Sequence, residues 1–139
     1  MPQSKALLQA IASGKLEDAK LLYAHGRFSN AYYLGGYAIE IALKACVTLQ
    51  IQAETLPDRR FIADIYTHEF EKLIGLAGLR AELRSRQNDD VQFQANWGLV
   101  NEWKPDTRYD SIDRTSAQLL LMATADEHHG ILPWITTFW

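Results

Sequence analysis

The chain has 139 residues, a formal net charge of -3 at pH 7, 47% hydrophobic residues and 22% charged residues. These values are those of an ordinary globular domain and argue against a disordered or membrane-embedded chain. The acidic balance lacks the basic surface that binding along a nucleic-acid backbone usually needs, so any nucleic-acid contact would have to be local. We expect one domain over residues 1–139, with one core.

Cysteine usage and the start of the chain indicate the compartment. Cys46 is the single cysteine, so the fold does not depend on an internal disulfide. Residues 1–15 lack the charged start and the apolar block of a signal peptide, and no apolar run reaches membrane-spanning length. We therefore expect a cytoplasmic protein.

The first two helices are predicted over residues 3–26 and 27–50. In the first range, apolar residues recur at steps of three and four, but Ser13 and Gly14 interrupt them. The pattern therefore leaves open one helix with a weak point or two short helices. The second range has no proline and is mostly apolar around its circumference, which predicts the central helix of the fold.

One face of this central helix is polar and the other is aliphatic. The polar stripe, spaced by three and four residues, is formed by Asn30, Tyr33, Tyr37, Glu40, Lys44 and Thr48. The aliphatic face, which should pack on the core, holds Ala31, Leu34, Ala38, Ala42, Ala45 and Leu49. Gly35 and Gly36 lie mid-helix, where each glycine costs about 1 kcal/mol relative to alanine. Close approach of a backbone, from another helix or from a second subunit, is the expected compensation.

Residues 51–104 predict shorter elements. Residues 51–66 form a loose connection with room for a short turn of helix, and Thr67 is the expected N-cap of a helix that stops at Gly78. Residues 79–87 continue as a short amphipathic helix. A further helix begins near Asp90, and its expected buried stripe is Phe93, Trp97, Val100 and Trp103.

The last long helix is predicted to open at Asp110 or Ser111 and to run to His128 and His129, before Gly130. The apolar tail, residues 131–139, is expected to dock on the bundle or on a partner chain. No strand pattern competes anywhere in the chain. The sequence therefore predicts an all-α fold, an up-and-down bundle of four or five helices.

Three segments resemble the HEPN family (higher eukaryotes and prokaryotes nucleotide-binding domains). Residues 32–45, YYLGGYAIEIALKA, resemble the signature helix of these domains, and residues 67–73 resemble the following element, which a histidine opens. Trp103 and the pair Arg108 and Tyr109 resemble the tryptophan and arginine-tyrosine pair that precede the last long helix in one subgroup. The matches occur in the expected order and span most of residues 23–125.

The resemblance implies a HEPN-like helical bundle, commonly dimeric, that partners a small nucleotidyltransferase in bacterial and archaeal operons, as in toxin-antitoxin pairs. Many such proteins are metal-independent ribonucleases whose motif is an arginine followed, after four to six residues, by a histidine. This sequence departs from that motif, because His68 follows Arg60 at too long an interval and His128 lies far beyond Arg114. Whether the chain is an enzyme is therefore left open.

The residues predicted to bind a ligand combine the polar stripe with the HEPN-like positions. Glu40 and Lys44 are spaced for a helix-surface ion pair, His68 offers a neutral imidazole, and the Arg108 guanidinium suits a phosphate or a carboxylate. His68 and Arg108 are the candidates for catalysis. The full predicted set is Tyr33, Tyr37, Glu40, Lys44, His68, Arg108 and Tyr109.

No metal or cofactor is expected. The run Asp126, Glu127, His128 and His129 could suggest a metal site, but adjacent helical side chains point about 100° apart and cannot meet one ion. The chain also has no Walker-type loop, glycine-rich dinucleotide turn, CxxC or HExxH.

Three functions remain as hypotheses. The leading one is a HEPN-type binding and partner module in a nucleotide- or RNA-related context, acting as a homodimer that buries Gly35 and Gly36 or the tail against its mate. The second is a degenerate metal-independent HEPN ribonuclease that uses His68 and Arg108. The third is a purely structural oligomerisation module.

Overall fold

The computed structural model describes residues 4–51 and 53–139, except for the side chain of Arg108. These residues form eight α-helices and two short 3-10 helices, with no strand among them. The elements are α1 (Lys5–Ala24), α2 (Phe28–Val47), η1 (Thr48–Gln50), α3 (Arg59–Ile65), α4 (Phe70–Leu76), α5 (Arg80–Asp89), α6 (Val91–Val100), η2 (Pro105–Tyr109), α7 (Arg114–Ala125) and α8 (Ile131–Thr136).

The all-α class is thus confirmed, but the predicted count of four or five helices is too low. The helices α3 and α8 have seven and six residues. Segments shorter than two turns carry too little periodicity to be recognised in a sequence.

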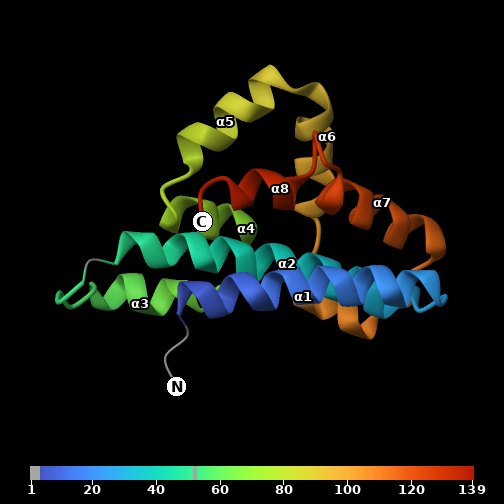
Figure 1. The fold of residues 1–139 in the computed structure, drawn as a ribbon, viewed down its shortest axis with the longest axis horizontal. Helices are drawn as coiled ribbons and strands as arrows, with labels where there is room; N and C mark the ends of the chain where they lie inside the picture. The colour runs from blue at the N-terminus through green and yellow to red at the C-terminus, as the bar shows by residue number, and fades with distance from the viewer. Residues whose placement is uncertain (1–3, 52) are drawn as a thin grey trace.

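The long helices α1 and α2 form an antiparallel pair (Figure 1). Helix α1 is continuous through Ser13 and Gly14, because its buried stripe of Leu8, Ala12, Leu16 and Ala19 runs past them without a break. Helix α2 also contacts α4, α7, α8 and η2, which makes it the central helix as predicted. Leu49 was expected in the core but lies beyond the end of α2 and is exposed.

The two mid-helix glycines are explained within one subunit. A Cβ atom on Gly36 would overlap the indole ring of Trp103, and one on Gly35 would lie 2.9 Å from Leu121 Cδ2. The absence of a Cβ atom at these two positions therefore lets the side chains of Trp103 and Leu121 pack directly on the backbone of α2. The expected approach of another backbone or of a second subunit is corrected accordingly.

Several helix boundaries follow local capping, and two predicted helix starts are wrong. Asp90 caps α6 as expected, accepting from Phe93 N, and Asp113 is the N-cap of α7, so α7 starts later than Asp110 or Ser111. Helix α4 starts at Phe70, with Glu69 at the N-cap position, because the Thr67 hydroxyl instead accepts from Glu69 N and shapes the link before it.

The C-terminal segment completes the core. Helix α7 ends at Ala125, so His128 and His129 lie in the turn after it and not in its last turn. The tail then folds into α8, whose Ile131, Leu132, Trp134 and Ile135 are buried against the chain's own helices. None of the helices in the described ranges is both long and apolar enough to cross a membrane.

Candidate functional site

The candidate site is centred on Glu40, a carboxylate in the middle of the central helix. The side chain of Glu40 is only 1% exposed, yet its two oxygens serve two cations or hydrogen-bond donors. Oε1 lies 2.7 Å from His68 Nδ1, and Oε2 accepts a hydrogen bond of 3.3 Å from Lys44 Nζ. A buried carboxylate needs such partners, because removing an ion from water without pairing is very costly.

Two different parts of the chain bring these three groups together. Glu40 and Lys44 lie one turn apart on α2, whereas His68 lies in the short link between α3 and α4. The side chains of Lys44 and His68 are 20% and 50% exposed, so both connect the buried carboxylate to the surface. Because a carboxylate accepts hydrogen bonds, Nδ1 of His68 is the donor in this contact, and Nε2 is the ring nitrogen that the contact leaves unused.

An aromatic cluster borders the Glu40 site. The ring of Trp103 lies 6.1 Å from that of Tyr33 and 6.2 Å from that of Tyr37, and it stacks on Phe70 at 5.5 Å with an interplanar angle of 5°. The buried Nε1 of Trp103 has no hydrogen-bond partner in the described part of the chain. Tyr33 and Tyr37, both predicted from the polar stripe, therefore lie beside Glu40, with their rings 5.7 Å apart.

A hollow lies on each side of Glu40. The first, which we call the α1–α2 hollow, has a volume of about 400 Å³ and includes Lys15, Tyr33, Tyr37, Glu40 and Lys44 in its lining. The second, the α4 hollow, has a volume of about 690 Å³ and is lined in part by His68, Phe70, Trp103 and Lys104. Glu40 lines the first hollow and His68 lines the second, so the contact between these two side chains connects the hollows.

Lys15 was not predicted as a site residue. It lies on α1, and its Nζ stands 5.9 Å from the ring centroid of Tyr37. No sequence motif surrounds Lys15. Its place in the hollow depends on how α1 packs against α2, which the sequence does not show. Burial, followed by the nearby Glu40 carboxylate, raises the pKa of Tyr37, which keeps its hydroxyl neutral and able to donate.

The remaining predicted residues do not join this cluster, or fall outside the description. Asn30 is exposed, and the Thr48 hydroxyl donates to the Ala45 carbonyl of its own helix at 2.6 Å. Tyr109 is largely exposed, on η2. The side chain of Arg108 lies outside what the structure describes, so its convergence with the polar stripe stays a prediction.

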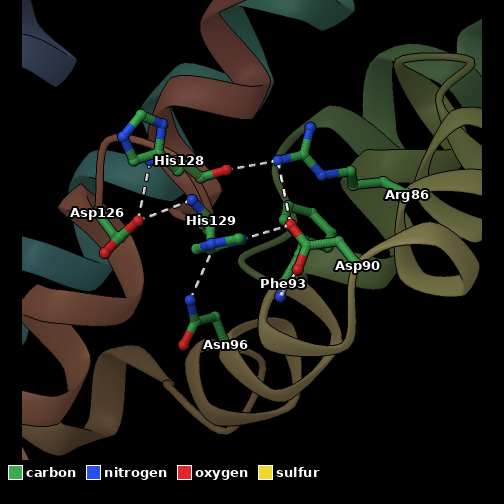
Figure 2. A network of polar contacts seen from close by, with 7 residues as sticks. All are labelled: Arg86, Asp90, Phe93, Asn96, Asp126, His128 and His129. Atoms are coloured by element: carbon green, nitrogen blue, oxygen red, sulfur yellow. Dashed lines mark hydrogen bonds and ion pairs between the residues drawn. The ribbon is translucent and has the colours of Figure 1, made fainter.

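A second histidine–carboxylate pair joins Asp90, at the start of α6, to His129, in the turn before α8 (Figure 2). Oδ2 of Asp90 is 2.7 Å from His129 Nδ1 and 3.3 Å from Arg86, while Oδ1 accepts from Phe93 N at 2.9 Å. The hydrogen bond from His129, and then the one from the Phe93 backbone, lower the pKa of Asp90. All the contacts of this carboxylate therefore hold local structure.

The neighbours of the second pair fasten the same junction. Arg86 donates to the His128 carbonyl at 2.6 Å and Asn96 donates to the His129 carbonyl at 2.9 Å. Asp126 accepts from the backbone N–H groups of His128 and His129, which makes it a turn-forming residue (Figure 2). In the described ranges, no three His, Cys, Asp or Glu side chains are grouped so as to hold a metal ion.

The lone cysteine has the character of a core residue. Cys46 is buried, and its Sγ contacts the Ile135 carbonyl at 3.8 Å. Burial raises the pKa of the thiol to about 11, so the thiolate required of a nucleophile is scarce at neutral pH.

Comparison with known proteins yields no match: no protein-family model, no curated protein and no solved structure is similar to this chain. The geometry around Glu40 is therefore the feature of the molecule that bears on its function.

Proposed function

We propose that the chain is a HEPN-type binding and partner module that works in a nucleotide- or RNA-related context. The proposal is supported by one observation: two segments of the HEPN-like pattern, residues 32–45 and 67–73, meet at Glu40, whose carboxylate contacts both Lys44 and His68. The segments are separated along the chain, so their meeting is a property of the fold and not of local spacing.

The burial of Glu40 favours a binding role over a merely structural one. Replacing a buried ion pair by well-packed apolar residues is often neutral or stabilising, so an ion pair is a poor means of holding a core together. Glu40 is buried among apolar residues of α2, but its two partners reach the surface beside the two hollows. This arrangement suits the orientation of Lys44 and His68 toward a ligand.

The binding role is tested by titrating a short fluorescent RNA and a nucleoside triphosphate into the protein in the absence of metal. Glu40→Gln and His68→Ala should each weaken the binding at least tenfold, because each removes one part of the oriented group. Lys72→Ala is the matched control, since Lys72 forms an ion pair with Asp64 at 3.4 Å and lines neither hollow. Equal affinity in all four proteins would overturn the proposal.

The proposed partners are a second copy of this chain, which would form a homodimer, and a small nucleotidyltransferase. Gly35, Gly36 and the apolar side chains of α8 in the tail, which motivated the dimer, are buried within the subunit. A homodimer would therefore use exposed apolar side chains such as Leu21 on α1 and Met122 on α7. Light scattering of the protein alone, and of the protein co-expressed with a nucleotidyltransferase encoded beside it, tests both parts; a monomer in each sample would reject them.

A second candidate function is the degenerate metal-independent ribonuclease. It is favoured by the Glu40–His68 contact, because a carboxylate that holds Nδ1 leaves Nε2 free to act as a general base. RNA incubated with the protein and a chelator should then be cleaved, and His68→Ala should abolish the cleavage. Intact RNA with the wild-type protein would rule this function out and leave the binding module.

A further inference from the structure

The α1–α2 hollow carries more positive charge than its own side chains neutralise. Glu40 is the one acidic residue in its lining, and this carboxylate already contacts Lys44 and His68. Lys15, on the facing helix, forms no ion pair with any carboxylate in the described part of the chain. In the described part of the chain, Lys15 Nζ instead lies 5.9 Å from the centroid of the Tyr37 ring. A partly buried lysine without a counter-ion attracts an anion.

Two tyrosines line the same hollow. Tyr33 and Tyr37 are half-buried and share its lining with Lys15, and no hydrogen bond joins either hydroxyl to another described residue. A tyrosine hydroxyl is a donor at neutral pH because its ordinary pKa is about 10, and burial, followed by the Glu40 carboxylate, raises the pKa of Tyr37 further. The lining of one hollow thus includes a lysine from α1 and two tyrosines from α2, and phosphate oxygens accept hydrogen bonds from ammonium and hydroxyl groups of this kind.

The rest of the hollow is aliphatic. Leu8 and Ile11 of α1 face Leu34 and Ile41 of α2 across it. The volume of about 400 Å³ is within the range of small-molecule sites. An apolar wall beside a group of donors suits a ligand that has one anionic end and a flat or apolar body.

We propose that the α1–α2 hollow binds the phosphate group of a nucleoside monophosphate, with Lys15 as its counter-charge and the hydroxyls of Tyr33 and Tyr37 as donors. This inference rests on the proposed nucleotide-related function and names the ligand class and the residues that recognise it.

The test is calorimetric titration with the four ribonucleoside 5′-monophosphates, the four matching nucleosides and inorganic phosphate. At least one monophosphate should bind the wild-type protein tenfold or more tightly than its nucleoside. Lys15→Met should reduce the affinity for that monophosphate at least tenfold and leave the nucleoside unaffected. Tyr37→Phe, which keeps the ring and removes the hydroxyl, should reduce it about threefold. Lys20→Met is the control, because Lys20 lies on the same helix but pairs with Glu17 at 3.7 Å outside the hollow.

The outcomes separate this inference from the function on which it rests. If monophosphates bind and Lys15→Met binds them as well as the wild type, the phosphate lies elsewhere and the inference fails, whereas the nucleotide-related function stands. If inorganic phosphate alone binds as tightly as any monophosphate and depends on Lys15, the site is a simple anion site and the nucleoside part of the inference fails. If neither nucleotides nor RNA bind, both proposals fall.

Discussion

The two histidine–carboxylate pairs of this fold share a contact of 2.7 Å from Nδ1 to oxygen but differ in everything around it. Asp90 is 14% exposed, and besides His129 it caps α6 and pairs with Arg86. Glu40 is almost fully buried and caps no helix; its other contact is with Lys44. The contacts of Asp90 all stabilise the junction of two helical segments, whereas those of Glu40 orient two side chains beside hollows. The same local chemistry can thus serve structure in one place and a candidate site in another.

We expect the largest effect from a substitution that displaces Trp103, whose ring contacts Tyr33 and Tyr37 beside the Glu40–His68 pair. Gly36→Ala introduces a methyl group where the indole ring lies, and we expect a net loss of about 2 kcal/mol of unfolding free energy, because overpacking outweighs the helix-propensity gain. Urea denaturation measures this loss. Gly14→Ala is the control: no atom lies within 4 Å of the added methyl group, so a gain of about 1 kcal/mol is expected. Equal effects of the two substitutions would contradict the packing of Trp103 on α2.

Removal of the buried carboxylate should separate stability from binding. Glu40→Ala leaves Lys44 partly buried without its partner, at a cost of about 1–2 kcal/mol given the access of Lys44 to solvent. The double replacement Glu40→Leu and Lys44→Met should recover most of that stability, since apolar residues can replace a buried ion pair. Denaturant unfolding and nucleotide titration are measured on the same samples. Recovered binding in the double variant would place Glu40 among purely structural residues.

The Asp90–His129 pair should instead determine part of the loss of stability at low pH. The folded-state pKa of Asp90 is lowered, so its contribution to stability is present above the unfolded value of about 3.9 and is lost as the pH falls through the folded value. Asp90→Asn retains a capping side chain but removes this titration. The difference in melting temperature between wild type and variant should therefore shrink from pH 7 to pH 3. A difference that stays constant with pH would show that the charge of Asp90 contributes nothing.

The smallest stability effects should come from the histidines, and they should differ in function. His129→Ala removes one side-chain contact of the junction and should cost about 1 kcal/mol or less, with nucleotide binding unchanged. His68→Ala removes a half-exposed ring and should cost a similar amount, but should abolish most of the binding. Paired melting and titration experiments distinguish these cases. If the two variants lost binding equally, the contrast between the pairs would be lost.

Helix spacing accounts for the part of the candidate site that the sequence predicts. Glu40 and Lys44 lie four residues apart and therefore share a face, and Asp90 begins a helix for reasons of local capping. The family resemblance placed His68 in the same predicted ligand-binding set as Glu40, but the contact between them was not predicted, because 28 residues separate the two side chains and no local spacing connects them.

Contacts that depend on how whole helices pack were not predicted. The place of Lys15 in the α1–α2 hollow depends on the register of α1 against α2, and the overlap of Trp103 with Gly36 depends on the path of the chain after α6. The contact of His129 with Asp90 joins residues 39 apart, and periodicity shows only which face of each helix is apolar. Which faces then meet is decided by tertiary packing.

Helix α5 stands away from the rest of the fold, and this has a kinetic consequence. It packs mainly on α4 and α6, and Leu83 is its one buried side chain in the described structure (Figure 1). Because little apolar surface holds it, its amide hydrogens should exchange with solvent through local opening, while those of α2 wait for global unfolding. Arg80 and Arg84 are exposed on this helix, so trypsin acting on the native protein should make its first cut there.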